Sequence, residues 1–300
     1  MAGSSLPRRA FGRTLRRYRE RVGKSQLAAG LAAEISPQGI SRLEEGYKIR
    51  IATSQIKDLL DLYEVSGSER EEVLSLWREV KDQDLVAKAA GIESSWWRSY
   101  SDQYAPHFDH YLALEEVATH LTTLQMVLLP GLLQTQEYRR TMIRIASPDL
   151  SAVDVERGVE LAMRRRTRLE NNEFRIDVLL WEPTICGRSG GGTIMADQLR
   201  YLVEVSERPN VSIRVVPLDV VGHLGLIVQT FTLLEFPASS IGRTVEPPIV
   251  YVEGYEGALF HERDEVIARH RRAISDIQGL ALSEEDTRLL VTSRAKEYAA

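Results

Sequence analysis

The sequence predicts an all-α N-terminal domain followed by an α+β C-terminal domain with a small sheet. Apolar residues recur at helical spacing through the first 80 residues, whereas short β-branched runs separated by turn residues follow residue 173. The formal charge is also unequal, +7 over residues 1–50 and −12 over the remainder. Single hydrophobic cores usually stop growing near 300 residues, so we expect two domains. We place them at 1–80 and 96–300, with a polar connection at 81–95.

Composition excludes several classes of protein. The first twenty residues are rich in arginine and contain no apolar run of the kind that a secretory signal needs. The longest apolar run, Leu124–Leu133, contains Pro-Gly and is too short to cross a bilayer. The single cysteine, Cys186, rules out an internal disulfide and a multi-cysteine metal site. We expect a soluble cytoplasmic protein that needs no membrane, metal or cofactor.

Positive charge is concentrated in the first predicted helix. Seven arginines lie in the segment from Arg8 to Arg21. Most of them lie off the apolar stripe of this helix, which includes Phe11 and Leu15 and ends before Gly23. Lysine and arginine displace the counterions condensed on phosphate, so a small basic domain is typical of proteins that bind a polyanion.

Two short helices are predicted next. Ser25 is placed to cap the first, which runs to about Ala33 with Leu27 and Leu31 one turn apart. The stretch ISPQGISRLEEG then predicts another helix, because the Ser36 hydroxyl can cap it and Pro37 suits a first position where no N–H is needed.

The outward face of this helix carries the first candidate site. Ile40 and Leu43 are spaced to face inward, which leaves three polar side chains outside: Gln38, Ser41 and Arg42. Two short helices around a tight turn describe a helix-turn-helix, whose second helix enters the major groove of DNA. A capped surface helix in an all-α bundle is the alternative.

The segment Gly23–Gly46, GKSQLAAGLAAEISPQGISRLEEG, resembles Xre-type regulators related to phage repressors. The resemblance implies that Gln38 and Arg42, with Ser41 beside them, read bases, that Gln26 and Ser36 contact phosphate, and that Arg19 pairs with Glu44. Lys48 and Arg50 are further candidates for phosphate contacts on charge alone.

Three positions depart from the family pattern. Glu34 stands where members usually have glycine, so a non-glycine residue is expected at positive φ. Gly30 replaces the usual alanine, which keeps close helix packing but costs roughly 1 kcal/mol of helix propensity. Gly39 offers no side chain in the recognition helix, so base readout rests on few residues.

Two more helices complete the predicted N-terminal domain. Thr53 is expected to cap the fourth helix, whose apolar residues begin at Ile56. Ser68 and Glu71 have the spacing of a capping box for the fifth helix, which we expect to bury Trp77.

The C-terminal domain is expected to contain both helices and strands. Helices are expected at 109–126, 134–146, 152–170, 194–206, 263–277 and 283–297. Strands are expected within 174–181, 211–218, 228–236 and 249–254. Four short strands predict a small sheet.

A second resemblance covers nearly this whole domain. It lies in WWRSYSDQYAPHFDHYLALEEVA, LLPGLLQTQEYRR, SERPNVSIRVVPL, FTLLEFP and IVYVEGYEGALF. These segments look like the C-terminal domain of the actinobacterial, antitoxin-like (WhiJ-like) group of Xre-type regulators. That resemblance implies a regulator whose C-terminal domain senses a small-molecule effector or docks a small protein partner.

A serine hydrolase is the remote alternative. GRSGG at Gly187–Gly191 satisfies the G-x-S-x-G pattern with Ser189 at its centre, and His223, His261 and His270 follow it. Pro183 interrupts the approach, the loop is glycine-rich, and four strands are too few for a hydrolase sheet. We therefore expect a protein that is not an enzyme.

Other side chains carry weaker signals. His107 and His110 lack a third metal ligand, so we expect surface or capping roles and no metal site. A candidate ligand or partner site comprises Trp96, Trp97, Tyr100, Arg164 and Arg165. Burial in a core is the first interpretation for the aromatic residues, and a solvated helix face for the arginines.

Together these observations predict a cytoplasmic transcriptional regulator that binds double-stranded DNA sequence-specifically. It would act as a homodimer, so that two recognition helices meet half-sites roughly 34 Å apart. An antitoxin-like interaction module that acts mainly through a small partner protein is the alternative function.

Overall fold

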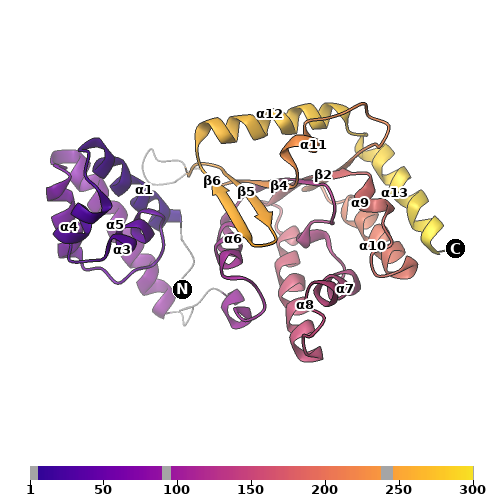
Figure 1. The fold of residues 1–300 in the computed structure, drawn as a ribbon, viewed down its shortest axis with the longest axis horizontal. Coiled ribbons are helices and arrows are strands. Elements are labelled where there is room, and N and C mark those ends of the chain that lie inside the picture. The colour runs from indigo at the N-terminus through magenta and orange to yellow at the C-terminus, as the bar shows by residue number, and fades with distance from the viewer. Residues whose placement is uncertain (1–5, 90–95, 238–245, 300) are drawn as a thin grey trace. The chain divides into compact units, whose positions relative to one another are not determined.

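The computed structural model describes residues 6–89, 96–237 and 246–299 (Figure 1). These residues form two compact units. The N-terminal unit contains the described residues up to Ser99, together with 112–117 and Glu246. The C-terminal unit contains 100–111, 118–237 and 247–299.

The N-terminal unit consists of helices, as predicted. They are α1 (Leu6–Arg21), α2 (Gln26–Ala32), α3 (Pro37–Glu44), α4 (Thr53–Leu62) and α5 (Gly67–Ala89). Phe11, Leu15 and Tyr18 of α1 pack with Trp77 of α5 in one buried cluster. Helix α5 continues past residue 80, where we expected the domain to end.

Helix caps explain where the short helices begin. The Ser25 hydroxyl accepts a hydrogen bond from the Ala28 N–H at 3.1 Å, and the Ser36 hydroxyl accepts one from the Gly39 N–H at 3.0 Å, as predicted. The prediction for Thr53 is wrong, because Ala52 is the N-cap of α4. The Thr53 hydroxyl instead accepts a hydrogen bond from the Trp77 indole N–H at 3.0 Å, which ties α4 to α5.

One further detail of the helices differs from the sequence-based expectation. Ser68 lies inside the first turn of α5 instead of capping it, because the helix begins at Gly67. Leu27 and Leu31 on α2 are exposed, whereas Ala29 and Ala33 face the core. Small side chains on the inner face let α2 pack closely against its neighbours.

The turn between α2 and α3 contains the positive φ predicted at Glu34, where φ is 53°. We expect Glu34→Gly to raise the free energy of unfolding by about 0.5–1 kcal/mol, because glycine occupies this region without a Cβ clash. The urea midpoint of the N-terminal unit measures it. Glu45→Gly is the control, since Glu45 has a right-handed φ of −80° and should gain nothing.

The C-terminal unit is α+β, as predicted, and is built on one mixed sheet. Its strands are β1 (His120–Gln125), β2 (Arg175–Trp181), β3 (Val211–Val216), β4 (Phe231–Glu235), β5 (Ile249–Gly254) and β6 (Gly257–His261). They lie in the order β3-β2-β1-β4-β5-β6. Strands β1, β2 and β3 are parallel, and β4, β5 and β6 join antiparallel.

The helices of this unit are α6 (Pro106–Val117, which extends into the N-terminal unit), α7 (Gln136–Ala146), α8 (Ala152–Arg166), α9 (Pro183–Cys186), α10 (Gly192–Val205), α11 (Gly225–Val228), α12 (Asp264–Leu280) and α13 (Glu284–Ala299). Short 3-10 helices cover Trp96–Tyr100, Gly131–Leu133 and Thr167–Glu170. Helix α12 covers one face of the sheet, and α10 and α13 cover the other (Figure 1).

The sheet corrects two predictions. The expected helix at 109–126 ends at Val117, and β1 follows as a strand between β2 and β4. Four consecutive residues of β1, from Leu121 to Leu124, are buried, so β1 shows no alternation that would identify it as a strand. Strand β6 was also missed, which makes six strands instead of four.

His120, at the start of β1, lies between two carboxylates. Its Nε2 is 2.9 Å from Asp177 Oδ2, and its Nδ1 is 3.0 Å from Glu235 Oε2. The hydrogen bond with Asp177 raises the pKa of His120 above its ordinary value, although burial opposes the shift. The pKa of His120 is therefore higher in the folded chain than in the unfolded chain. The stabilisation that protonated His120 gives the folded state is complete below about pH 6.5 and is lost as the pH rises through the folded-state pKa.

We therefore expect the stabilising contribution of His120 to be lost as the pH rises from 6 to 8, so that His120→Gln and wild type differ most in stability at low pH. Urea midpoints at several pH values measure it. His261→Gln is the comparison, because burial lowers the pKa of His261 and gives its contribution the opposite pH dependence. Equal pH profiles for wild type and His120→Gln would contradict the assignment.

Candidate nucleic-acid interface

Helix α3 presents the predicted polar face. Ile40 and Leu43 are buried at 1% and 2% exposure and point into the core. Gln38 is exposed, and Ser41 and Arg42 are half-buried. Ser41 and Arg42 follow Gln38 by three and four residues, so these side chains share the side of α3 opposite the core.

Local contacts hold two of these side chains in place. The Ser41 hydroxyl donates a hydrogen bond to Glu45 Oε1 at 2.8 Å. The Arg42 guanidinium lies 5.7 Å from the centre of the Tyr47 ring. An arginine resting on an aromatic ring loses less conformational freedom when it binds a ligand.

A buried ion-pair network joins α1, α2 and α3. Arg19 Nε and Nη2 donate to the two oxygens of Glu44 at 2.5 and 2.9 Å, and Arg19 Nη1 donates to the Lys24 carbonyl at 2.9 Å. The bond with Glu44 raises the pKa of Arg19 above its ordinary value. Gln26 Nε2 donates to Glu44 at 3.1 Å. The network fixes α3 against the other two helices, and it occupies one donor of Gln26.

Helices α1 and α3 meet through their backbones at Gly12. A Cβ atom there would lie 2.4 Å from the Leu43 carbonyl oxygen and 2.6 Å from that of Glu44. Gly30 plays a similar part on α2, where a Cβ would lie 2.5 Å from the Ile35 carbonyl oxygen. Two glycines therefore determine how closely α3 approaches its neighbours.

The arginines of α1, which carry most of the positive charge of the N-terminal helices, are mostly paired with carboxylates. Arg9 Nε donates to Glu246 at 2.7 Å, and both Arg13 Nη atoms donate to the same carboxylate at 2.7 Å. The remaining pairs are Arg8 with Asp84, Arg16 with Glu20, and Arg21 with Glu69. Glu246 is distant in sequence, and no local pattern indicated it.

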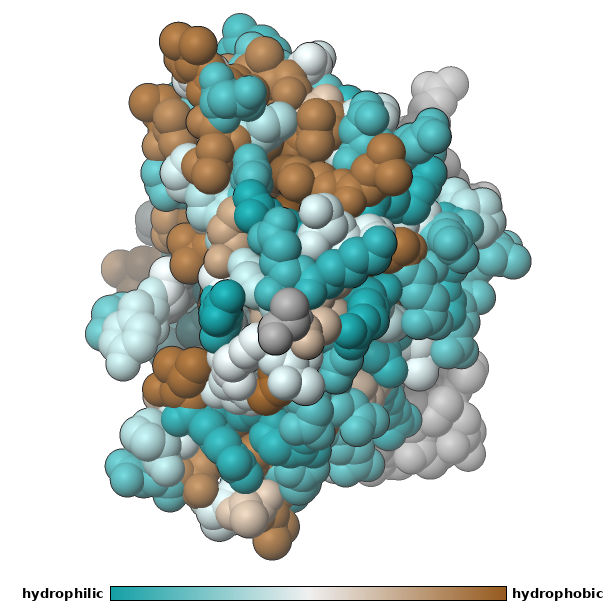
Figure 2. Space-filling model, turned by 90° about the vertical axis from the view of Figure 1, so that its right-hand side faces the viewer, coloured by the Kyte–Doolittle hydropathy of each residue, from teal (hydrophilic) through white to brown (hydrophobic). Residues whose placement is uncertain are grey.

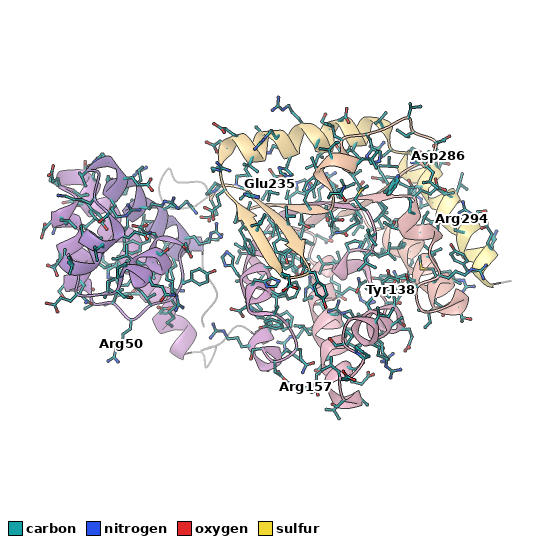
Figure 3. All side chains as sticks on the ribbon, viewed as in Figure 1. Arg50, Tyr138, Arg157, Glu235, Asp286 and Arg294 are labelled. Atoms are coloured by element: carbon teal, nitrogen blue, oxygen red, sulfur yellow. The ribbon has the colours of Figure 1, made fainter. Side chains whose placement is uncertain are left out.

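The two candidates that follow α3 differ from each other. Lys48 Nζ lies 3.3 Å from Asp84 Oδ1, so an acidic residue already shares its charge. Arg50 is exposed, and Figure 3 shows its side chain pointing away from the ribbon of the N-terminal unit. Arg50 is therefore the better placed of the two to reach a phosphate.

The residues of the candidate ligand or partner site belong to different units. Trp96 and Trp97 lie in the N-terminal unit, with Trp97 buried and the Trp96 indole 3.5 Å from Glu116. The others lie in the C-terminal unit. Burial and a hydrogen bond with Glu160 raise the pKa of Tyr100, and Arg164 lies beside this pair.

Arg165 is buried, contrary to a solvated helix face. Its guanidinium lies 5.0 Å from the centre of the Phe108 ring and 5.8 Å from that of Tyr111. The sequence gives no sign of this, because the run Arg164–Arg166 looks uniformly polar.

Ser189 lies in the loop between α9 and α10. Helix α9 separates it from the end of β2, so it does not sit on a sharp turn directly after a strand. The buried Tyr138 lies near it. Among the described residues, His223, His261 and His270 make no hydrogen bond with Ser189.

Among the described residues, no group of three or more histidine, cysteine or acidic side chains could hold a metal ion. None of the helices in that part of the chain is both long and apolar enough to span a membrane. The two histidines considered earlier contact other groups: His107 lies 4.0 Å from Glu253, and His110 lies against the Phe260 ring.

Comparison with known proteins agrees with the division of the chain. A family model described as a helix-turn-helix domain matches residues 10–73, which cover α1 from Ala10 onward, α2, α3, α4 and the start of α5. A second model, described as a domain of unknown function (DUF5753), matches residues 108–293. A search of curated proteins and a search of solved structures each found no match. Because the second match spans more than half of the residues, the chain belongs to the DUF5753 family, and a helix-turn-helix domain precedes that family's domain.

Proposed function

We propose that this protein is a sequence-specific, DNA-binding transcriptional regulator of the Xre type. The observation that carries the proposal is the outward face of α3, with Gln38, Ser41 and Arg42, in a segment that matches a helix-turn-helix domain. Arginine can pair bidentately with guanine and glutamine with adenine, while a serine hydroxyl can bond to several bases. Two copies would place two such faces on half-sites one helical turn apart.

Phosphate contacts come from few residues in this proposal. Gln26 and Ser36 lie at the starts of α2 and α3, and Lys48 and Arg50 follow α3. Since carboxylates pair with most arginines of α1, we expect only about two to four neutralised phosphates per subunit, and a correspondingly shallow dependence of affinity on salt.

The test is DNA binding by the full chain. Selection from random duplexes identifies the operator, and titration at several salt concentrations follows. We expect Arg42→Ala to weaken operator binding by about 1–3 kcal/mol and to relax preference at one base pair. Arg50→Ala should weaken binding to all sequences alike and reduce the salt slope by about one.

Arg78→Ala is the matched control, because it removes the same charge from an exposed side chain on α5 whose hydrogen bond, within the described part of the chain, goes to the Leu74 carbonyl of its own helix. It should leave operator preference unchanged. If Arg42→Ala bound every duplex as the wild type does, α3 would not be the recognition helix.

The C-terminal unit is proposed to control DNA binding by sensing an effector or docking a small protein, as in the antitoxin-like, WhiJ-like group. Two clefts favour effector binding. One, of about 460 Å³, is lined by Arg175, Arg208 and Arg288 together with Glu207 and Glu284, and suits a polar ligand. The other, of about 680 Å³, lies on α8 beside Val153 and Met163. Thermal stabilisation by a metabolite that also changes operator affinity would support sensing, and co-purification of a small protein would support docking.

We propose that the protein is not an enzyme. The helix between β2 and Ser189 supports this view, because a nucleophile elbow requires a tight strand-to-helix turn. An activated phosphonate that labelled the wild type and spared Ser189→Ala would contradict it.

A further inference from the structure

An exposed apolar surface lies on the C-terminal unit between β3 and β4. Within residues 218–228, here called the apolar loop, five large side chains have exposures from 43% to 105%: Leu218, Val221, Leu224, Leu226 and Ile227. Leu280, at the end of α12, is 40% exposed. Figure 2 shows apolar side chains gathered at the top of this face of the molecule.

Backbone hydrogen bonds define the conformation of the apolar loop, so the exposure of its apolar side chains does not result from an irregular backbone. The Leu226 N–H donates to the His223 carbonyl at 3.1 Å, and the Val228 N–H donates to the Leu224 carbonyl at 3.0 Å. On the inner side His223 is buried, with its ring centre 6.1 Å from that of Trp181. A Cβ at Gly225 would lie 3.1 Å from Leu124 Cδ2 of β1, so the loop packs closely on the sheet at this point.

The chemistry of the loop selects a protein partner. Asp219 is its one acidic residue, and no lysine or arginine occurs from Val215 to Gln229. A membrane surface or a nucleic acid attracts basic side chains, which this segment lacks. Depletion of charge around large apolar side chains is instead typical of the core of a protein–protein interface.

We infer that the apolar loop is the surface through which two copies of this chain associate. The exposed fractions correspond to roughly 500–600 Å² of apolar surface per subunit, which approaches the ~800 Å² that each partner of a stable complex buries. An apolar patch is complementary to itself, as a twofold contact requires. The choice of a second copy rests on the proposed function, because a helix-turn-helix reads paired half-sites as a dimer.

Charged substitutions in the full chain test this surface. Val221 and Ile227 are 105% and 78% exposed, so glutamate at either position should leave the fold intact. A glutamate buried between two subunits would lose its hydration and gain no hydrogen-bond partner in return. We therefore expect Val221→Glu and Ile227→Glu each to weaken self-association at least about a hundredfold. Sedimentation equilibrium without DNA measures it, and circular dichroism checks the fold.

Leu289→Glu is the matched control, because Leu289 on α13 is 65% exposed and lies outside the loop; it should leave the dimer unchanged. A wild type that stays monomeric, including one that binds anionic vesicles through this loop, would overturn the inference. So would a dimer that tolerates both glutamates.

DNA binding is measured separately on a single half-site. Loop variants that are monomeric but keep the wild-type base preference would support the inference together with the proposed function. A dimer that depends on the loop yet binds no DNA would refute the proposed function, while the assignment of this surface as the dimer interface would still hold.

Discussion

Glu246→Ala is expected to lower the free energy of unfolding of the N-terminal unit by about 3–5 kcal/mol. The carboxylate is 3% exposed and accepts three hydrogen bonds from Arg9 and Arg13, and the Arg9 side chain is 2% exposed. Removing the carboxylate would take away the charged partner that the buried Arg9 guanidinium shares with Arg13, which costs far more than loss of a surface ion pair. Urea denaturation, with hydrogen exchange of α1 amides, measures the effect.

Two variants separate charge from packing. Arg13→Ala should cost less than Glu246→Ala, because the Arg13 side chain is 24% exposed and Arg9 keeps its partner. The double variant Arg9→Met, Glu246→Met should recover part of the loss, since replacing both members of a buried pair by apolar groups is often close to neutral. Equal stability of Glu246→Ala and wild type would show that the buried Arg9 guanidinium does not depend on Glu246.

Gly12→Ala should lower the free energy of unfolding by about 3 kcal/mol, at the upper end for overpacking. The new methyl group would lie 2.4 Å from the Leu43 carbonyl oxygen, and backbone cannot rotate out of the way as a side chain can. Helix α3 would have to move away from α1. We therefore expect operator affinity to fall together with the urea midpoint.

Gly279→Ala is the control for this substitution. Gly279 lies in α12, and a Cβ there would have no neighbour within 4 Å. It should be neutral or raise stability by up to about 1 kcal/mol, because alanine is the better helix former. A Gly12→Ala protein as stable as the wild type would mean that α1 and α3 do not approach as closely as described.

The N-terminal helices were predictable because their information is local. The caps at Ser25 and Ser36 and the positive φ at Glu34 depend on residues a few positions away. The state of the arginines was not predictable from the same sequence. Glu246 is more than 230 residues from Arg9 and Arg13, and an arginine off an apolar stripe looks the same whether water or a carboxylate surrounds it.

Strands were predictable where they alternate or carry β-branched runs, as β2 and β3 do. Strand β1 was mistaken for the end of a helix, because burial on both faces removes the period of two. Its environment depends on β2 and β4, which no local window contains. The buried position of Arg165 against Phe108 and Tyr111 was hidden for the same reason.

The central place of β1 has a consequence for synthesis. On the ribosome β1 emerges early, but His120 pairs with Arg175 on one side and Glu235 on the other, so both neighbours are still untranslated. Until residue 235 has left the exit tunnel, one edge of β1 stays unpaired, and the nascent chain offers strand edges and apolar surface to other chains. We therefore expect the sheet to close late and as a whole, with truncated translation products prone to aggregate.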